Sequence, residues 1–69
     1  MNEMEKLSIL LSHWIEHTKE HAEEYLNWAK RLEELGHTEI ARELRDSSQM
    51  LIESNQRLSN ARELLGERA

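Results

Sequence analysis

The chain has 69 residues, of which 33% are charged and 38% hydrophobic, and its formal net charge is −5. This is enough for one small domain, and the mixture is typical of long amphipathic helices. With no cysteine, disulfides and thiolate zinc ligands are excluded; two glycines without a proline argue against an all-β fold. The acidic balance disfavours nucleic acid, and no stretch is apolar enough for a membrane span, so we expect a cytoplasmic protein with neither partner.

Capping residues divide the chain into two long helices. Asn2 and Glu5 have the spacing of an N-cap and capping box, after which the helical pattern continues without a break. Gly36 suits the left-handed residue after a helix, Thr38 suits the N-cap of a second helix, and Gly66 suits its end. The chain is therefore predicted to be all-α, an antiparallel two-helix hairpin. The predicted elements are helix one at about 3–35, a turn at 36–38 and helix two at about 39–65.

Rows of side chains seven residues apart predict coiled-coil packing between the helices. Helix one carries two rows, which are Leu7, Trp14, His21, Trp28 and Leu35, and Leu11, Thr18, Tyr25 and Leu32. Helix two carries the row Leu44, Leu51, Leu58 and Leu65, flanked by Ile40, Ser47, Ser54 and Ala61. We expect these rows to meet, with both tryptophans in the core. If His21 is structural, its expected bonding partners are Ser48, Ser54 or Asn55.

The apolar arc of helix one is too wide for one helix–helix contact. It spans roughly 160°, whereas a two-helix seam needs about 100° or less. A single hairpin is therefore expected to leave Leu10, Ile15, Leu26 and Ile52 largely in water. A symmetric homodimer that forms a four-helix bundle is the usual solution for a chain of this size.

Residues 13–24 repeat the unit His-x-x-Glu three times. Histidines four residues apart are neighbours on a helix, and such a pair binds zinc, nickel, cobalt or copper. Glutamates of the repeat can add an oxygen ligand. The candidate metal ligands are His17, His21, Glu20 and Glu24. The alternative is that His21 is a core residue and that His13 and His17 are ordinary surface residues without a metal.

Catalytic patterns argue against an enzyme. The chain has no H-E-x-x-H motif and no glycine-rich loop for phosphate. The Glu-x-x-His order of di-iron bundles occurs only at Glu34–His37, across a glycine. The serines have no accompanying histidine and acid in a pattern that suggests a nucleophile.

Residues 13–24, continued by Tyr25, Trp28 and Ala29, resemble a motif of small uncharacterised helical-hairpin domains of prokaryotes, largely archaea. That motif reads H-W-I-E-H-N-x-x-H-A, followed by an aromatic residue and then Trp-Ala. Thr18 stands where the motif has Asn. The resemblance implies a helical hairpin and no established activity.

Two functional hypotheses follow from these patterns. The first is a non-enzymatic interaction or accessory module that acts as a homodimer, with another protein as a further candidate partner. The second is a small protein that binds Zn, Ni or Co through the His-x-x-Glu repeat. Stabilisation of the fold by added metal distinguishes the two, because a ligand that binds only the folded form must stabilise it.

Overall fold

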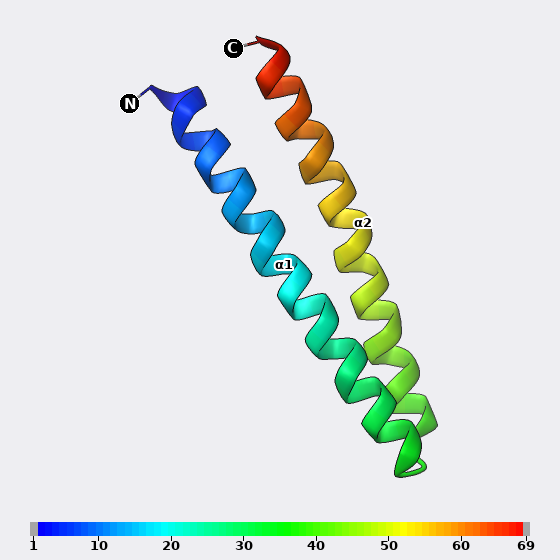
Figure 1. Cartoon of the computed structure of the whole chain (residues 1–69). Coiled ribbons are helices and arrows are strands. Elements are labelled where there is room, and N and C mark those ends of the chain that lie inside the picture. The colour runs from blue at the N-terminus through cyan, green and yellow to red at the C-terminus, as the bar shows by residue number, and fades with distance from the viewer. Residues whose placement is uncertain (1, 69) are drawn as a thin grey trace.

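The computed structural model describes residues 2–68, which form two long helices joined by a tight turn (Figure 1). Helix α1 comprises Glu3–Glu34 and helix α2 comprises Thr38–Arg68. The helices run antiparallel, and their ribbons are closest near the turn and farthest apart at the open end. The predicted all-α helical hairpin is confirmed. Within the described residues, neither helix combines the length and the apolar character needed to cross a membrane.

The start of α1 is capped by the side chain predicted to cap it. The Asn2 Oδ1 atom accepts a hydrogen bond of 2.8 Å from the backbone N–H of Glu5. In return, the Asn2 amide donates to the Glu5 carboxylate at 3.4 Å. Because the first backbone N–H groups of a helix lack partners, this exchange fixes where α1 begins.

The turn is closed by backbone hydrogen bonds around one glycine. Gly36 has a φ of 87°, the left-handed conformation that glycine adopts without a steric cost. Its N–H donates to the carbonyl of Glu33 at 3.0 Å, and the His37 N–H donates to that of Leu32 at 2.8 Å. This pattern is the Schellman motif, which reverses the chain within three residues. An ion pair between Arg45 and Glu33 spans the two helices beside the turn.

The second helix departs from the prediction at both ends. The His37 carbonyl accepts the first bond of α2 from the Ala41 N–H at 3.1 Å, so His37 is the capping residue and Thr38 is already helical. At the far end, α2 continues through Gly66 to Arg68. A helical glycine costs only about 1 kcal/mol relative to alanine. No described residue after Gly66 reverses the chain, so no positive φ is needed there.

Small residues form the centre of the contact between the helices, called the seam below. Ala29, Ala41 and Ser48 are each 0% exposed. The Ser48 hydroxyl donates to the backbone carbonyl of Ala22 on the opposite helix at 2.9 Å. Because a serine side chain is short, the two backbones must lie close together at this point. The seam is therefore a close contact of backbones at these small residues.

Two of the predicted rows belong to the seam and two do not. The seam rows of α1 are Leu11, Thr18, Tyr25 and Leu32, as predicted, and Ile15, Ala22 and Ala29. Those of α2 are Leu44, Leu51, Leu58 and Leu65, as predicted, and Ala41, Ser48 and Asn55. Members of the other two predicted rows are exposed, with Trp14 at 41% and Trp28 at 54%. The prediction of core tryptophans is wrong because indole rings in the seam would hold the backbones apart.

The remaining predictions about burial are settled by the same geometry. His21 is exposed, while Ser48 and Asn55 bond to backbone carbonyls of α1, so the prediction of a core histidine is wrong. Leu10, Leu26 and Ile52 are exposed, as expected for a single hairpin. The fourth side chain expected in water, Ile15, is half-buried because it belongs to the seam.

We predict that Ala29→Leu destabilises the hairpin, because a leucine side chain at a fully buried position forces the backbones apart. The expected loss in the free energy of unfolding is about 1–3 kcal/mol. Asn27→Leu, at an exposed position on the outer side of α1, is the matched control and should stay within about 0.5 kcal/mol of the wild type. Urea unfolding followed by circular dichroism measures both. Equal effects of the two changes would contradict a close seam at Ala29.

Candidate functional site

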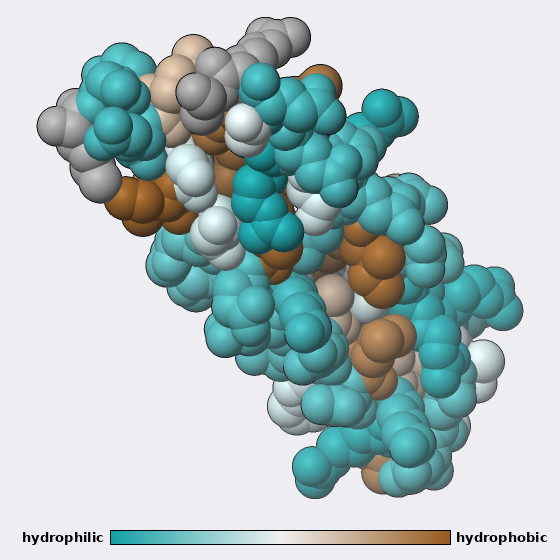
Figure 2. Space-filling model, turned by 45° about the horizontal axis from the view of Figure 1, so that its top comes forward, coloured by the Kyte–Doolittle hydropathy of each residue, from teal (hydrophilic) through white to brown (hydrophobic). Residues whose placement is uncertain are grey.

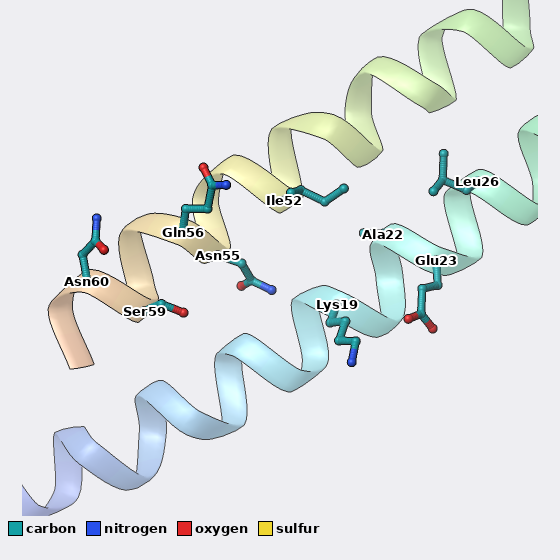
Figure 3. Close-up of a pocket in the computed structure, with 9 residues that line it drawn as sticks. All are labelled: Lys19, Ala22, Glu23, Leu26, Ile52, Asn55, Gln56, Ser59 and Asn60. Carbon is teal, nitrogen blue, oxygen red and sulfur yellow. The ribbon is translucent and has the colours of Figure 1, made fainter. Parts of the chain in front are cut away.

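One broad side of the hairpin carries an open cavity of about 440 Å³ (Figure 3). Leu26 of α1 and Ile52 of α2, each 41% exposed, provide its apolar surface. Asn55 extends from α2 toward α1 at its floor. We call this side the pocket face. The residues that line it are Lys19, Ala22, Glu23, Leu26, Ile52, Asn55, Gln56, Ser59 and Asn60.

Only one of the two polar atoms of the Asn55 side chain in this cavity has a hydrogen-bond partner. Its amide N–H donates to the Ile15 carbonyl at 2.9 Å. Its Oδ1 atom is buried without a hydrogen-bond partner among the described residues. A buried acceptor left unpaired costs about 1–3 kcal/mol. Asn55 therefore specifies the alignment of the helices at the expense of stability, as buried asparagine does in coiled coils.

On the surface seen in Figure 2, hydrophobic residues interrupt an otherwise largely hydrophilic exterior. Most of the exposed large hydrophobic residues, however, lie on the side of the hairpin opposite the pocket face. Of the twelve large hydrophobic side chains exposed among the described residues, eight lie on this side. We call it the aromatic face. Those eight residues are Leu7, Leu10, Trp14, Trp28, Leu35, Ile40, Met50 and Leu64.

Helical phase assigns these residues to one side. In α1, the pocket residue Leu26 flanks the seam row of Ala22, whereas Trp14 and Trp28 flank the other seam row. In α2, Ile52 flanks the seam row that contains Ser48, whereas Ile40 flanks the other seam row, which begins at Leu44. Because the pocket flanks of both helices line one cavity, their opposite flanks must share the other broad side. The guanidinium of Arg31 lies over the Trp28 ring on this side, 5.7 Å from the ring centroid.

The histidines of the repeat form a ladder along α1. The ring centroids of His13 and His17 are 4.9 Å apart, and those of His17 and His21 are 5.6 Å apart. Tyr25 continues the ladder, with its ring centroid 6.4 Å from that of His21. All three histidines are exposed. Two imidazoles at this helical spacing can supply two nitrogen ligands to one metal ion.

A single hairpin does not assemble a larger set of ligands around the ladder. In residues 2–68, no three or more His, Asp or Glu side chains are grouped so as to hold a metal ion. Zinc sites in proteins have three or four protein ligands. The predicted ligand set of His17, His21, Glu20 and Glu24 stays a prediction, and all four side chains are exposed.

Residues missed by the sequence analysis include Met50 and Leu64, which carry the aromatic face onto α2. Met50 lies three residues after Ser47, and Leu64 lies three residues after Ala61. Ser47 and Ala61 belong to the exposed row of α2 beside the seam, so the faces of Met50 and Leu64 follow once the seam is known. The overlooked pattern was the seven-residue spacing of Ala22 and Ala29. Alanines at that spacing indicate the seam as directly as leucines do, when the contact is close.

Comparisons with known proteins find relatives without a recorded activity. Residues 7–65 match a domain described as "Domain of unknown function (DUF8180)". An "Uncharacterized protein" of Archaeoglobus fulgidus is 41% identical over 63 residues, which cover 91% of this chain and 100% of that protein. No solved structure matches the chain. These findings confirm the predicted resemblance to a small uncharacterised, largely archaeal domain.

We predict that Asn55→Leu leaves the hairpin as stable as the wild type or stabilises it. The change removes the unpaired buried acceptor together with its one hydrogen bond, and the open cavity accommodates the leucine. Ser48→Leu is the matched control, since Ser48 is 0% exposed; we expect it to lower the free energy of unfolding by about 1–3 kcal/mol. Thermal unfolding of both variants is the measurement. A large loss for Asn55→Leu would show that Oδ1 has a partner.

Proposed function

From the geometry of the hairpin we propose that this chain, which belongs to the DUF8180 family, a domain of unknown function, is a non-enzymatic interaction module. In this proposal it acts as a homodimer through the aromatic face. The observation that carries the proposal is the placement of eight of the twelve exposed large hydrophobic side chains on one side. Exposed large hydrophobic side chains gathered on one side of a protein in this way mark interaction sites.

The dimensions of the hairpin support a second copy as the occupant of this face. The Cα trace measures 51 × 17 × 11 Å, so each broad side has a footprint of roughly 870 Å², against the ~800 Å² per partner of a standard stable interface. A chain of this length also buries too little apolar surface to be very stable alone. Covering the aromatic face adds the core that the thin seam does not provide.

The spacing of residues on the aromatic face supports helix packing in particular. Positions three and four residues apart alternate along this face of α1 from Leu7 to Leu35, which is the heptad spacing of a helix that packs against another helix. The apolar members lie toward the two ends of α1, and polar side chains take the remaining positions, which are His17, His21, Glu24 and Arg31. The proposed second packing surface of α1 therefore has apolar ends and a polar middle.

Two further observations favour an interaction module over an enzyme or a nucleic-acid-binding protein. The buried Ser48 hydroxyl donates to a backbone carbonyl and so acts as a structural group. The net charge of −5 opposes binding to phosphate backbones.

We predict that Trp28→Lys weakens the homodimer much more than Leu26→Lys does. The two residues lie two positions apart on α1, are 54% and 41% exposed, and point to opposite faces. Tryptophan side chains at the centre of an interface contribute about 2 kcal/mol or more. We therefore expect the dimer dissociation constant to rise about 30-fold or more for Trp28→Lys and less than about threefold for Leu26→Lys. Sedimentation equilibrium over a range of concentrations measures both constants.

The wild type is the first control of this experiment, and we expect it to have twice the 8.2 kDa mass of one chain at tens of micromolar. A folded monomer at that concentration would contradict the proposal. A dimer weakened by Leu26→Lys but not by Trp28→Lys would assign the interface to the pocket face instead.

The adjacent, exposed imidazoles favour a second candidate function, a small protein that binds a divalent metal such as Zn, Ni or Co. His17 and His21, with ring centroids 5.6 Å apart, are the proposed nitrogen ligands. Glu20 and Glu24 are the proposed oxygen ligands, one or two helical turns along the same helix. The surrounding row of carboxylates attracts a cation to this part of α1.

We predict that, if this candidate is correct, Ni²⁺ or Zn²⁺ raises the melting temperature of the wild type and not that of His17→Ala. His37→Ala is the matched control, because His37 lies in the turn, away from the ladder, and should leave the metal effect intact. A ligand at 100 times its Kd stabilises the folded form by about 2.7 kcal/mol. No change of melting temperature with either metal would eliminate this candidate.

A further inference from the structure

The arrangement of side chains on the aromatic face specifies how a second copy sits on it. We propose that α1 packs antiparallel against α1 of the second copy, with the two-fold axis passing through His21. This arrangement rests on the proposed homodimer. Each α2 then packs against α2 of the other copy. The turns of the two hairpins lie at opposite ends of the resulting four-helix bundle.

The first support is a symmetric order of residues along α1. The row that follows the middle of the aromatic face has the same order in both directions: Leu7, Trp14, His21, Trp28 and Leu35. In an interface with two-fold symmetry, a residue that contacts another is contacted by it in return. An antiparallel pair of α1 helices centred on His21 therefore places each tryptophan opposite a tryptophan and each terminal leucine opposite a leucine.

The polar groups near the axis are complementary in this arrangement. Two neutral imidazoles at His21 each have one donor and one acceptor nitrogen, so they can bond to one another. His17 of one copy lies opposite Glu24 of the other, and the same contact repeats on the other side of the axis. The centre of the interface therefore leaves no charged group without a partner of suitable chemistry.

A two-fold axis through His21 also sets the level of the axis on α2. The hydrogen bonds from Ser48 to Ala22 and from Asn55 to Ile15 show that residues whose numbers add up to 70 lie level with each other. His21 is thus level with residue 49 of α2. The row of α2 on the same face is Ile40, Ser47, Ser54 and Ala61, and the centre of this row lies midway between Ser47 and Ser54.

That centre is about 2 Å from the level of residue 49, at 1.5 Å per residue. One axis must serve both helices of a symmetric dimer, so on α2 it passes close to Ser47. The small serines at the centre of the α2 row also allow those two helices to approach closely.

Disulfide cross-linking tests the arrangement directly, because the chain contains no cysteine of its own. A residue on the two-fold axis meets its own copy, so His21→Cys should form a covalent dimer under mild oxidation. His13→Cys, at another exposed rung of the same ladder, is the matched control. The paired thiols are held together in the dimer, so we expect at least about tenfold more covalent dimer from His21→Cys.

A pair of double variants distinguishes the two helix pairings that face-to-face packing allows. Leu7→Cys with Leu35→Cys should cross-link two copies if α1 packs against α1. Leu7→Cys with Ala61→Cys should do so only if α1 packs against α2 of the second copy. Non-reducing electrophoresis reads the covalent dimer in each case.

These experiments distinguish a wrong arrangement of the two copies from the absence of a homodimer. Sedimentation of the wild type and of the reduced variants reports whether a dimer forms, whatever its geometry. A dimer that cross-links through Leu7 and Ala61, or one in which His21→Cys forms no more covalent dimer than His13→Cys, overturns the arrangement and leaves the homodimer standing. A monomeric wild type overturns both.

Discussion

The close approach of the two backbones along Ala22, Ala29, Ala41 and Ser48 determines where the other side chains of the hairpin lie. At these positions alanine and serine leave no room for a large side chain, and the hydrogen bond from Ser48 to the Ala22 carbonyl requires the backbones to be near each other. Dispersion contacts between close backbones and small side chains add to the contacts of the leucine rows beside them. The tryptophans consequently lie beside the seam and not within it.

The aromatic face is a direct consequence of this contact. Trp14 and Trp28 flank the seam rows instead of filling them, and the histidine ladder runs beside them on α1. A helix that packs closely on one side and presents a second heptad surface on another can belong to a bundle larger than one hairpin. The proposed homodimer uses this second surface. The ladder then lies within or next to the interface, so binding of a metal at His17 and His21 would compete with docking of a second copy.

The sequence predicts the fold well because its local rules are strong. Asn2, Glu5 and Gly36 mark the ends of α1 through backbone hydrogen bonds that depend on a few neighbouring residues. The choice between adjacent rows of α1 is less local, since it depends on how closely the helices approach. Counting large residues favours the tryptophan row, whereas the structure pairs alanines and serines. That contact distance is a property of both helices together, which explains why the same sequence predicts the hairpin correctly and the tryptophans wrongly.

Prediction of the candidate site from the sequence is limited in the same way, because it also depends on the contact between the two helices. Periodicity predicts that Leu10, Leu26 and Ile52 stay exposed on a single hairpin, and they do. Periodicity alone does not divide them between two faces, because that division requires the position of the seam. The helical spacing of the histidines likewise predicts their proximity along α1, but it does not decide whether further ligands join them, and residues 2–68 contain no group of three or more such side chains.

A hairpin with a Cα trace only 11 Å deep has no interior that separates its two broad sides. The residues of the seam are the floor of the pocket face and the support of the aromatic face at once, and Asn55 belongs to both the seam and the cavity. Packed contacts of this kind transmit displacement instead of absorbing it. A molecule that wedges the helices apart from the pocket side would therefore shift the spacing of the tryptophan and serine rows on the other side.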